Sequence, residues 1–330
     1  MVLRVRPVRV ILLVVLILLT LGGGGAWLWW DRNQTPPLRV GTNVWPGYES
    51  LYLARELGFF EHRPIELLEL RSASDVMQLF RSGSIEAAAL TLDETLSILQ
   101  DGFDLGVVAV MDLSRGGDVL LARPGITTLA QLRGRRIGVE SSAVGAVLLD
   151  AALTAAQLND DQVEIVPLSV DEHEWAYSQG RIDAVVTFEP VATRLQERGA
   201  RRLFDSRQIP GRIVDVLVVR RDLLAGREKA LTALVRGHFR ALAYLNAQPG
   251  EAAPILSKRL GLAPEEVMQV YRGLHLPTLA ENHRWLSGPE PLLQVTGKQM
   301  AEFMWQRRLL RRPVQLDRLA EPQFLPRVLQ

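Results

Sequence analysis

The chain has 330 residues, 48% of them hydrophobic, which is enough apolar material for one large or two medium domains. Its net charge of +1 gives no electrostatic support for binding nucleic acid. There is no cysteine and the five histidines are scattered, so disulfides, thiol nucleophiles and a lipid anchor on cysteine are excluded, and neither a metal site nor a cofactor is expected.

The N-terminal 30 residues read as an export element. Arg4, Arg6 and Arg9 precede an apolar run, four glycines and three tryptophans. The segment fits a cleaved signal peptide. It also fits an uncleaved anchor, because residues 10–30 would form about 31 Å of helix with the tryptophans at the far interface. We favour the anchor for that reason. In either case residues 31–37 are a linker and the rest lies outside the cytoplasm, tethered to the inner membrane if the anchor is retained.

Strands and helices alternate through the next 85 residues. Apolar runs bounded by turn residues predict strands, and apolar residues at helical spacing predict helices of about ten residues. The expected strands are 38–43, 65–70, 86–91, 105–111 and 118–122, and the expected helices are 49–58, 73–82 and 93–99. This alternation is typical of a parallel, doubly wound α/β sheet.

A second set of similar elements follows. The expected strands are 136–139, 163–168 and 184–187, and the expected helices are 144–156, 171–178 and 190–198. Residues 213–219 form a long apolar strand that returns to the first lobe, whose sheet the helices 229–246, 250–260, 264–274 and 292–308 should cover. The lobes are therefore 38–123 plus 215–330, and 124–214. Two crossings, near Arg123 and Val214, would act as a hinge.

The two halves repeat each other with an offset of 97 positions. Arg39-Val40-Gly41 returns as Arg136-Ile137-Gly138, and residues 83–87 (GSIEA) return as residues 180–184 (GRIDA). Each copy then runs through an apolar stretch to a threonine and an acid. Two similar α/β units in one chain predict two lobes that face each other across a cleft.

In doubly wound sheets, ligands bind beyond the carboxyl ends of the strands. Candidate ligand-binding residues at those ends mix aromatic, hydroxyl and carboxylate groups, as small-molecule pockets do. They are Trp45, Tyr48, Ser74, Asp93, Gly117 and Asp118 in the first lobe, Ser141, Ser142, Phe188 and Glu189 in the second, and Asp215 on the return strand.

Several of these candidates have a structural alternative. Trp45, Tyr48 and Phe188 could simply belong to the core. Asp93 and its neighbour Glu94 could complement a helix dipole; we favour Asp93 for the cleft as the counterpart of Glu189. Glu189 could equally begin a helix before a proline.

Ser141 and Ser142 end a strand and open a helix, where backbone N–H groups suit an anionic oxygen. Ser142 would serve as an N-cap in any case. Gly117, in a glycine pair, lets the backbone approach a ligand closely. No nucleophile–base pairing or metal-ligand spacing accompanies these residues, so no catalytic residue and no enzymatic activity is expected.

Seven short stretches together resemble one family. They are residues 45–49 (WPGYE), 51–60 (LYLARELGFF), 72–75 (SASD), 88–94 (AALTLDE), 188–190 (FEP), 213–219 (IVDVLVV) and 279–282 (LAEN). The chain resembles the solute-binding proteins of ABC importers in the sulfonate, nitrate and taurine class, and within it the thiamine-pyrimidine-precursor type. The resemblance implies a type II periplasmic binding fold, a small-molecule ligand, and a membrane permease with its ATPase as partners of a monomer. The related pyrimidine-synthesising enzymes use a cysteine-rich segment, which this chain lacks.

The acids near the predicted cleft indicate the class of ligand. Asp93, Asp118, Glu140, Glu189 and Asp215 lie in or near it, with no arginine at a strand end. Burying unpaired carboxylates is costly, so an amino-bearing or zwitterionic solute is expected. An alternative with the same fold is a membrane-anchored sensor that acts on a signalling partner.

Overall fold

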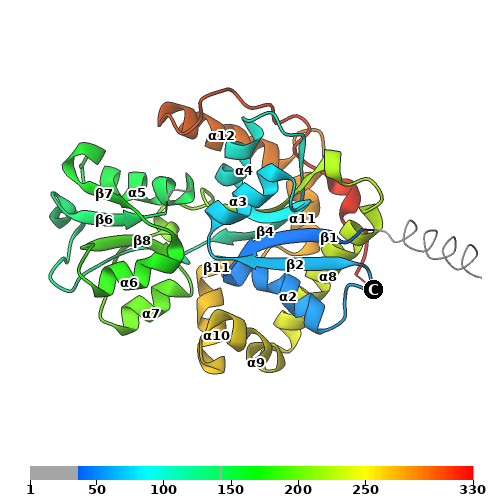
Figure 1. The fold of residues 1–330 in the computed structure, drawn as a ribbon, viewed down its shortest axis with the longest axis horizontal. Coiled ribbons are helices and arrows are strands. Elements are labelled where there is room, and N and C mark those ends of the chain that lie inside the picture. The colour runs from blue at the N-terminus through cyan, green and yellow to red at the C-terminus, as the bar shows by residue number, and fades with distance from the viewer. Residues whose placement is uncertain (1–35, 141–142, 330) are drawn as a thin grey trace, which may run out of the picture. The chain divides into compact units, whose positions relative to one another are not determined.

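The computed structural model describes residues 36–140 and 143–329. The predicted export segment, Ser141 and Ser142 lie outside the described residues. Within the described part of the chain, no helix is both long enough and apolar enough to cross a membrane. Residues 37–330 form one unit, which contains two β-sheets, each with its own helices (Figure 1).

The first sheet has six strands in the order β11-β4-β10-β3-β1-β2. β1 pairs in parallel with β2 and β3, and β10 runs antiparallel between β3 and β4. β3, β4 and β10 are buried along their whole length, which explains their nearly continuous apolar sequences. The strands are β1 (Leu38–Asn43), β2 (Ile65–Leu70), β3 (Ala87–Thr91), β4 (Leu105–Ser114), β10 (Val214–Arg220) and β11 (Leu274–His275).

The second sheet has five strands in the order β7-β6-β8-β5-β9. β6 pairs in parallel with β7 and β8, and β5 runs antiparallel to β8 and β9. The strands are β5 (Asp118–Ala122), β6 (Arg136–Val139), β7 (Glu164–Pro167), β8 (Ala184–Phe188) and β9 (Arg201–Asp205). The helices of this lobe are α5 (Ala143–Ala155), α6 (His173–Ser178) and α7 (Val191–Glu197).

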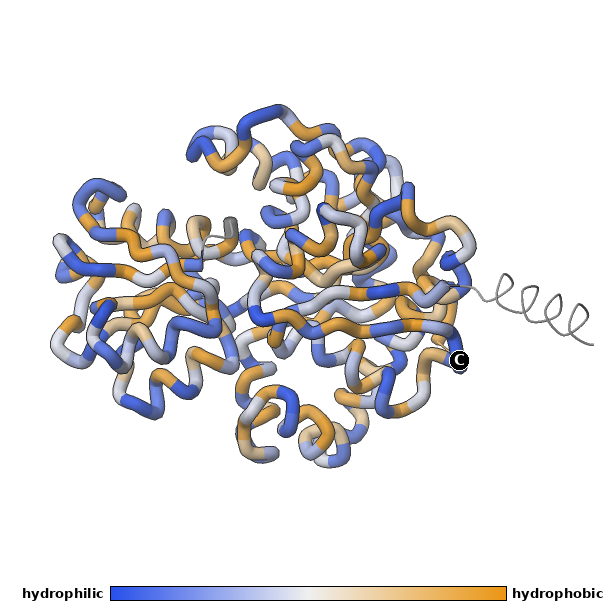
Figure 2. Tube along the Cα trace, viewed as in Figure 1, coloured by the Kyte–Doolittle hydropathy of each residue, from blue (hydrophilic) through white to orange (hydrophobic). Residues whose placement is uncertain are grey.

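Helices from both ends of the described chain enclose the first sheet. α2 packs on α8, and α4 packs on α12, so residues far apart in sequence share one core. Hydrophobic residues lie along the strands and on the helix faces turned toward them (Figure 2). The helices are α2 (Glu49–Glu56), α3 (Ala73–Ser82), α4 (Leu92–Leu99), α8 (Glu228–Ala247), α9 (Pro249–Leu260), α10 (Pro264–Val270), α11 (Leu279–Leu286) and α12 (Leu292–Gln306).

The sheet topology differs from the sequence-based lobe boundary at the first crossing. β5 pairs with β8 and β9 and so belongs to the second sheet, which puts the crossing at residues 115–117 instead of near Arg123. The expected helix 264–274 ends at Val270, because a 3₁₀ turn and β11 follow. β9 and α11 are additional elements. Asn282 holds α11 on β4 by accepting from Val110 N–H at 2.7 Å and donating to its carbonyl at 3.0 Å.

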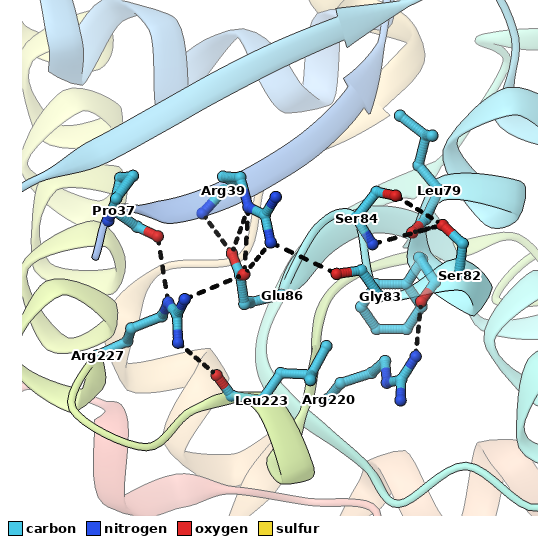
Figure 3. A network of polar contacts seen from close by, with 11 residues as sticks. Pro37, Arg39, Leu79, Ser82, Gly83, Ser84, Glu86, Arg220, Leu223 and Arg227 are labelled. Carbon is cyan, nitrogen blue, oxygen red and sulfur yellow. Dashed lines mark hydrogen bonds and ion pairs between the residues drawn. The ribbon is translucent and has the colours of Figure 1, made fainter.

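The internal repeat is also a repeat of side-chain geometry. In the first lobe, the backbone N–H of Arg39 donates to Glu86 at 2.8 Å, and the Arg39 guanidinium contacts the same carboxylate (Figure 3). In the second lobe, the backbone N–H of Arg136 donates to Asp183 at 3.0 Å, and the Arg136 guanidinium donates to the same carboxylate. We call these pairs the first and second braces. Each ties the start of a central strand to the loop before its parallel neighbour.

Candidate functional site

A cavity lies at the carboxyl ends of the central strands of both sheets. The space between its lining atoms is about 320 Å³, including the open mouth. It is lined by Asn43, Trp45, Tyr48, Ala73, Thr91 and Glu94 of the first lobe, by Asp118, Glu140, Val144 and Phe188 of the second, and by Ile213 and Asp215 on the return crossing. The position agrees with the rule for ligand sites in doubly wound sheets.

Aromatic rings from both lobes meet in this cavity. Trp45 follows β1, and Phe188 ends β8 in the other sheet. Their ring centroids are 5.6 Å apart and the planes are nearly perpendicular, at 89°. Gly117 makes room for the indole, because a Cβ at that position would lie 2.8 Å from Trp45 Cη2. The predicted close approach at Gly117 is therefore to a cavity side chain.

Two buried acids hold the first-lobe aromatic residues in place. Trp45 Nε1 donates to Asp112 Oδ2 at 2.9 Å, and the Tyr48 hydroxyl donates to Asp215 Oδ1. Asp112 and Asp215 face each other in the register of β4 and β10. Burial raises the pKa of Asp112 to about 7. Burial and the adjacent Asp112 charge hold the pKa of Asp215 well above its usual range. The pair therefore favours holding a proton near neutral pH.

The charged side chains that line the cavity are all acidic. They are Glu94, Asp118, Glu140 and Asp215, with no lysine, arginine or histidine among the lining residues that the structure describes. Burial raises the pKa of Asp118 to about 7, although the Ser114 hydroxyl opposes the shift. Burial also raises the pKa of Glu140 to about 8, and the charge of Glu94 adds to this effect.

Five of the predicted site residues line the cavity: Trp45, Tyr48, Asp118, Phe188 and Asp215. Ser74 lies next to it in the first turn of α3, and Gly117 lies behind Trp45. Ser141 and Ser142 fall outside the described residues.

The other two predicted residues lie away from the cavity lining. Asp93 is completely buried, which raises its pKa to about 8, and the cavity is lined by Glu94 instead. Glu189 accepts from the backbone N–H and the hydroxyl of Thr193 at 3.0 and 2.8 Å, so it acts as a cap of α7. This is the structural alternative that the sequence left open for Glu189.

The sequence contains a pattern that indicates where the Glu94 side chain lies. Thr91 and Glu94 have the spacing of a capping box, in which the glutamate turns back to the N-cap residue. The structure contains that box: Thr91 N–H donates to Glu94 Oε2 at 3.0 Å. Since Thr91 ends β3, the box brings the Glu94 carboxylate to the strand end. Asp112 also carried a signal, as a lone acid in an otherwise apolar strand.

The site has no arrangement suited to a metal ion. Across residues 36–140 and 143–329, no cluster of three or more histidine, cysteine, aspartate or glutamate side chains could hold one. The carboxylates of Glu94, Asp118, Glu140 and Asp215 line the cavity without forming such a cluster. Their arrangement suits a ligand with its own positive charge or hydrogen-bond donors.

Comparison with known proteins places the chain in a family. The family described as NMT1/THI5 like matches residues 45–252, more than half of the chain. The chain belongs to this family. A putative thiamine biosynthesis protein of Haemophilus influenzae is 24% identical over 291 residues, which cover 83% of this chain and 88% of the relative.

Solved structures confirm the periplasmic-binding-protein fold. The ligand-binding component of an ABC-type import system from Staphylococcus aureus, with zinc bound, has a TM-score of 0.73 and 17% identity, and the match covers 88% of this chain and 98% of that one. The alkanesulfonate-binding protein of Xanthomonas axonopodis pv. citri, bound to MOPS, has a TM-score of 0.71 and 19% identity, covering 85% and 97%. A desulfurization enzyme shares the fold at a TM-score of 0.61 and 21% identity, covering 87% and 97%. The same fold therefore occurs in ligand-binding proteins and in an enzyme.

Proposed function

We propose that this chain is the extracytoplasmic substrate-binding component of an ABC importer and that it captures a small, amino-bearing organic solute between its lobes. The observation that carries the proposal is the composition of the cavity: four carboxylates and three aromatic rings, with no basic side chain among the described lining residues. The ABC-import and sulfonate-binding proteins of the same fold support the transport role.

Electrostatics favours a cationic group in the ligand. Buried carboxylates without a counter-charge are costly, and here the cost is reduced by protonation, as the raised pKa values of Asp118 and Glu140 indicate. A ligand ammonium or amidinium would supply the missing positive charge. The rings of Trp45, Tyr48 and Phe188 offer faces for a cation or for a flat heterocycle. An amino-pyrimidine, an amine or an amidine fits this environment better than nitrate or a sulfonate without an amino group.

Binding explains the site better than catalysis. The only hydroxyls among the described lining residues belong to Thr91 and Tyr48. The Thr91 hydroxyl accepts from Glu94 N–H, and the Tyr48 hydroxyl donates to Asp215. The two buried histidines face other partners, since His173 contacts Thr187 and His238 contacts Ser50. These two hydroxyl–histidine pairs are buried, and none of their four residues lines the cavity, so neither pair is placed to act on a bound solute.

The remaining parts of the proposal concern location and partners. We infer that residues 1–30 direct the chain across the cytoplasmic membrane and tether it there, and that the lobes dock on a permease whose ATPase drives release. The apolar run flanked by arginines and tryptophans supports the tether. Labelling of the intact chain in cells from outside the membrane, followed by its fractionation, tests this part.

Ligand-dependent thermal unfolding tests the function. The full chain in detergent, stripped of co-purified ligand, is heated with amines, amino-pyrimidines, zwitterions, sulfonates or nitrate. A ligand at about 100 times its Kd should add about 2.7 kcal/mol of stability. We expect a shift with amino-bearing compounds that is lost in Asp118→Asn plus Glu94→Gln and kept in the control Glu172→Gln, whose carboxylate accepts from the Ser169 N–H in the turn before α6 and does not line the cavity. A shift with sulfonates or nitrate alone would contradict the ligand class.

A further inference from the structure

The N-terminus of α3 faces the cavity from the first lobe. Ala73, the first residue of the helix, lines it. The Ser72 side chain accepts from Asp75 N–H at 3.1 Å, and the Ser72 carbonyl accepts from Val76 N–H at 3.2 Å. The N–H groups of Ala73 and Ser74 precede the first intrahelical bond. Together with the helix dipole they create a region of positive potential in an otherwise acidic cavity.

A carboxylate from the other lobe faces this helix end. Glu140 directly follows β6 in the second sheet, is 4% exposed and lines the same cavity. It approaches the backbone N–H groups of Ala73 and Ser74 and the Ser74 hydroxyl, which oppose the rise in its pKa. Neither carboxylate oxygen reaches full hydrogen-bond geometry. The carboxylate is therefore directed at the helix end without completing a hydrogen bond to it.

From this arrangement we infer that Glu140 is a specificity-determining residue: its carboxylate takes the position at the α3 N-terminus that an anionic group of a solute would otherwise occupy. The inference deepens the proposed function and rests on it for the cationic part of the ligand. An anion entering the cavity must displace Glu140 and then lie near the Glu94 and Asp118 side chains. A cation meets neither obstacle, so the same residue rejects anions and attracts amines.

Methanesulfonate is a suitable anionic probe, because it has no amino group. Its affinity is measured by calorimetry with the full chain at about pH 9, above the pKa of about 8 that burial gives Glu140, for the wild type, Glu140→Ala and Glu140→Gln. Removing the Glu140 side chain frees the helix end, so Glu140→Ala should bind methanesulfonate at least about tenfold more tightly than the wild type. Glu140→Gln should show a smaller gain, because the amide removes the charge but still fills the space.

The matched control is Glu189→Ala. Glu189 is also a buried carboxylate of the second lobe, but it caps α7 and does not line the cavity. Its removal changes the net charge equally and should leave methanesulfonate affinity within about twofold. An equal gain in this control, or a folded Glu140→Ala with wild-type affinity, would overturn the inference. If Glu140→Ala does not fold, a Glu140→Gln affinity equal to that of the wild type would overturn it.

The two proposals can fail separately. Failure of every amine to bind the wild type would contradict the proposed function, whereas the methanesulfonate comparison depends only on Glu140 and the helix end. Conversely, amine binding by the wild type together with no anion gain in either Glu140 variant would leave the binding protein intact and remove Glu140 from its specificity.

Discussion

The positions of Trp45 and Tyr48 in the cavity depend on a close contact between the Gly47 backbone and the Asp112 side chain. A Cβ at this position would lie 1.7 Å from Oδ2 of Asp112, the atom that accepts from Trp45 Nε1. Asp112 is completely buried, so its side chain cannot swing into solvent to make room. The turn of residues 45–48 therefore requires glycine because of packing, and the aromatic side chains on both sides of Gly47 depend on it.

Gly47→Ala should destabilise the protein by about 3 kcal/mol and displace the Trp45 indole. Urea unfolding measures the first effect, and loss of amine binding measures the second. The control is Gly125→Ala, since no atom lies within 4 Å of a Cβ at Gly125. That control should stay within about 0.5 kcal/mol of the wild type. Equal stability of the two variants would show that Asp112 can move aside.

Asp112 lies outside the cavity lining yet fixes a residue that lines it. Asp112→Asn keeps a carbonyl acceptor for the Trp45 indole, whereas Asp112→Leu leaves a buried N–H without a partner at a cost of about 2 kcal/mol. We expect the asparagine variant to unfold near the wild-type urea midpoint and the leucine variant to unfold at clearly lower urea. If the leucine variant unfolds at the higher urea concentration, the proton held by the Asp112–Asp215 pair affects stability more than the hydrogen bond from the Trp45 indole does.

At the scale of elements, the repeat provides two braces of the same design in different environments. The Glu86 side chain is 2% exposed and also lies 3.5 Å from the Arg227 guanidinium (Figure 3). The Asp183 side chain of the second brace is 19% exposed. The carboxylate of the first brace is therefore almost fully desolvated and that of the second is partly hydrated, whereas the Arg39 and Arg136 side chains are about equally exposed. Removing the Glu86 charge leaves the mostly buried Arg227 guanidinium without a counter-charge, which is the costlier situation.

Glu86→Gln should therefore lower the free energy of unfolding by about 3 kcal/mol, and Asp183→Asn by about 1 kcal/mol. The exposed pair Arg55–Glu56 is the control, and Glu56→Gln should change stability by less than about 0.5 kcal/mol. Denaturant unfolding of the three variants gives the ranking. Equal losses for the two braces would mean that burial does not set their strength.

Much of this element order could be predicted from sequence, because the periodicity of apolar residues and the turn residues around them are local properties. The partner sheet of β5 could not be predicted, since five apolar residues indicate burial without indicating which strand pairs with them. The cavity shows the same limit. Aromatic residues and acids at strand ends were predictable, but the choice between Asp93 and Glu94 depended on the direction in which a capping box turns one side chain.

At the scale of the whole 37–330 unit, the two crossings between the sheets are joined by hydroxyl groups. Ser114 ends β4 just before the first crossing and Ser206 begins the second, and their Oγ atoms are 2.7 Å apart. Ser206 Oγ also accepts from Gly116 N–H at 2.6 Å, and Ser114 Oγ accepts from Asp118 N–H at 3.1 Å. These hydrogen bonds therefore join the two crossings to each other and to the backbone of Asp118, a residue that lines the cavity.

The buried acids give the whole molecule an unusual pH dependence. Asp118 and Glu140 have ordinary pKa values near 4 in the unfolded chain and about 7 and about 8 in the folded one. Between the unfolded and the folded pKa values of these two acids, the folded state binds more protons than the unfolded state. Their contribution to stability is therefore greatest at low pH and is lost as the pH rises through the folded pKa values. His173 and His238, with folded pKa values of about 4 and about 3, lower stability only below about pH 6.5.

The ligand-free protein should therefore lose stability steadily from pH 6.5 to 9, as measured by urea unfolding of the full chain at each pH. Asp118→Asn plus Glu140→Gln should make this dependence shallower, because two of the protonated groups are gone while Asp93, Asp112 and Asp215 keep their raised pKa values. A saturating amine should also flatten it in the wild type, since its charge replaces the protons and the carboxylates ionise in its presence. Binding would then release protons, so amine affinity should rise with pH until the amine itself loses its charge. A pH profile that the amine leaves unchanged would mean that the ligand cation does not reach these carboxylates, and the acidic cavity would lose its role in recognition.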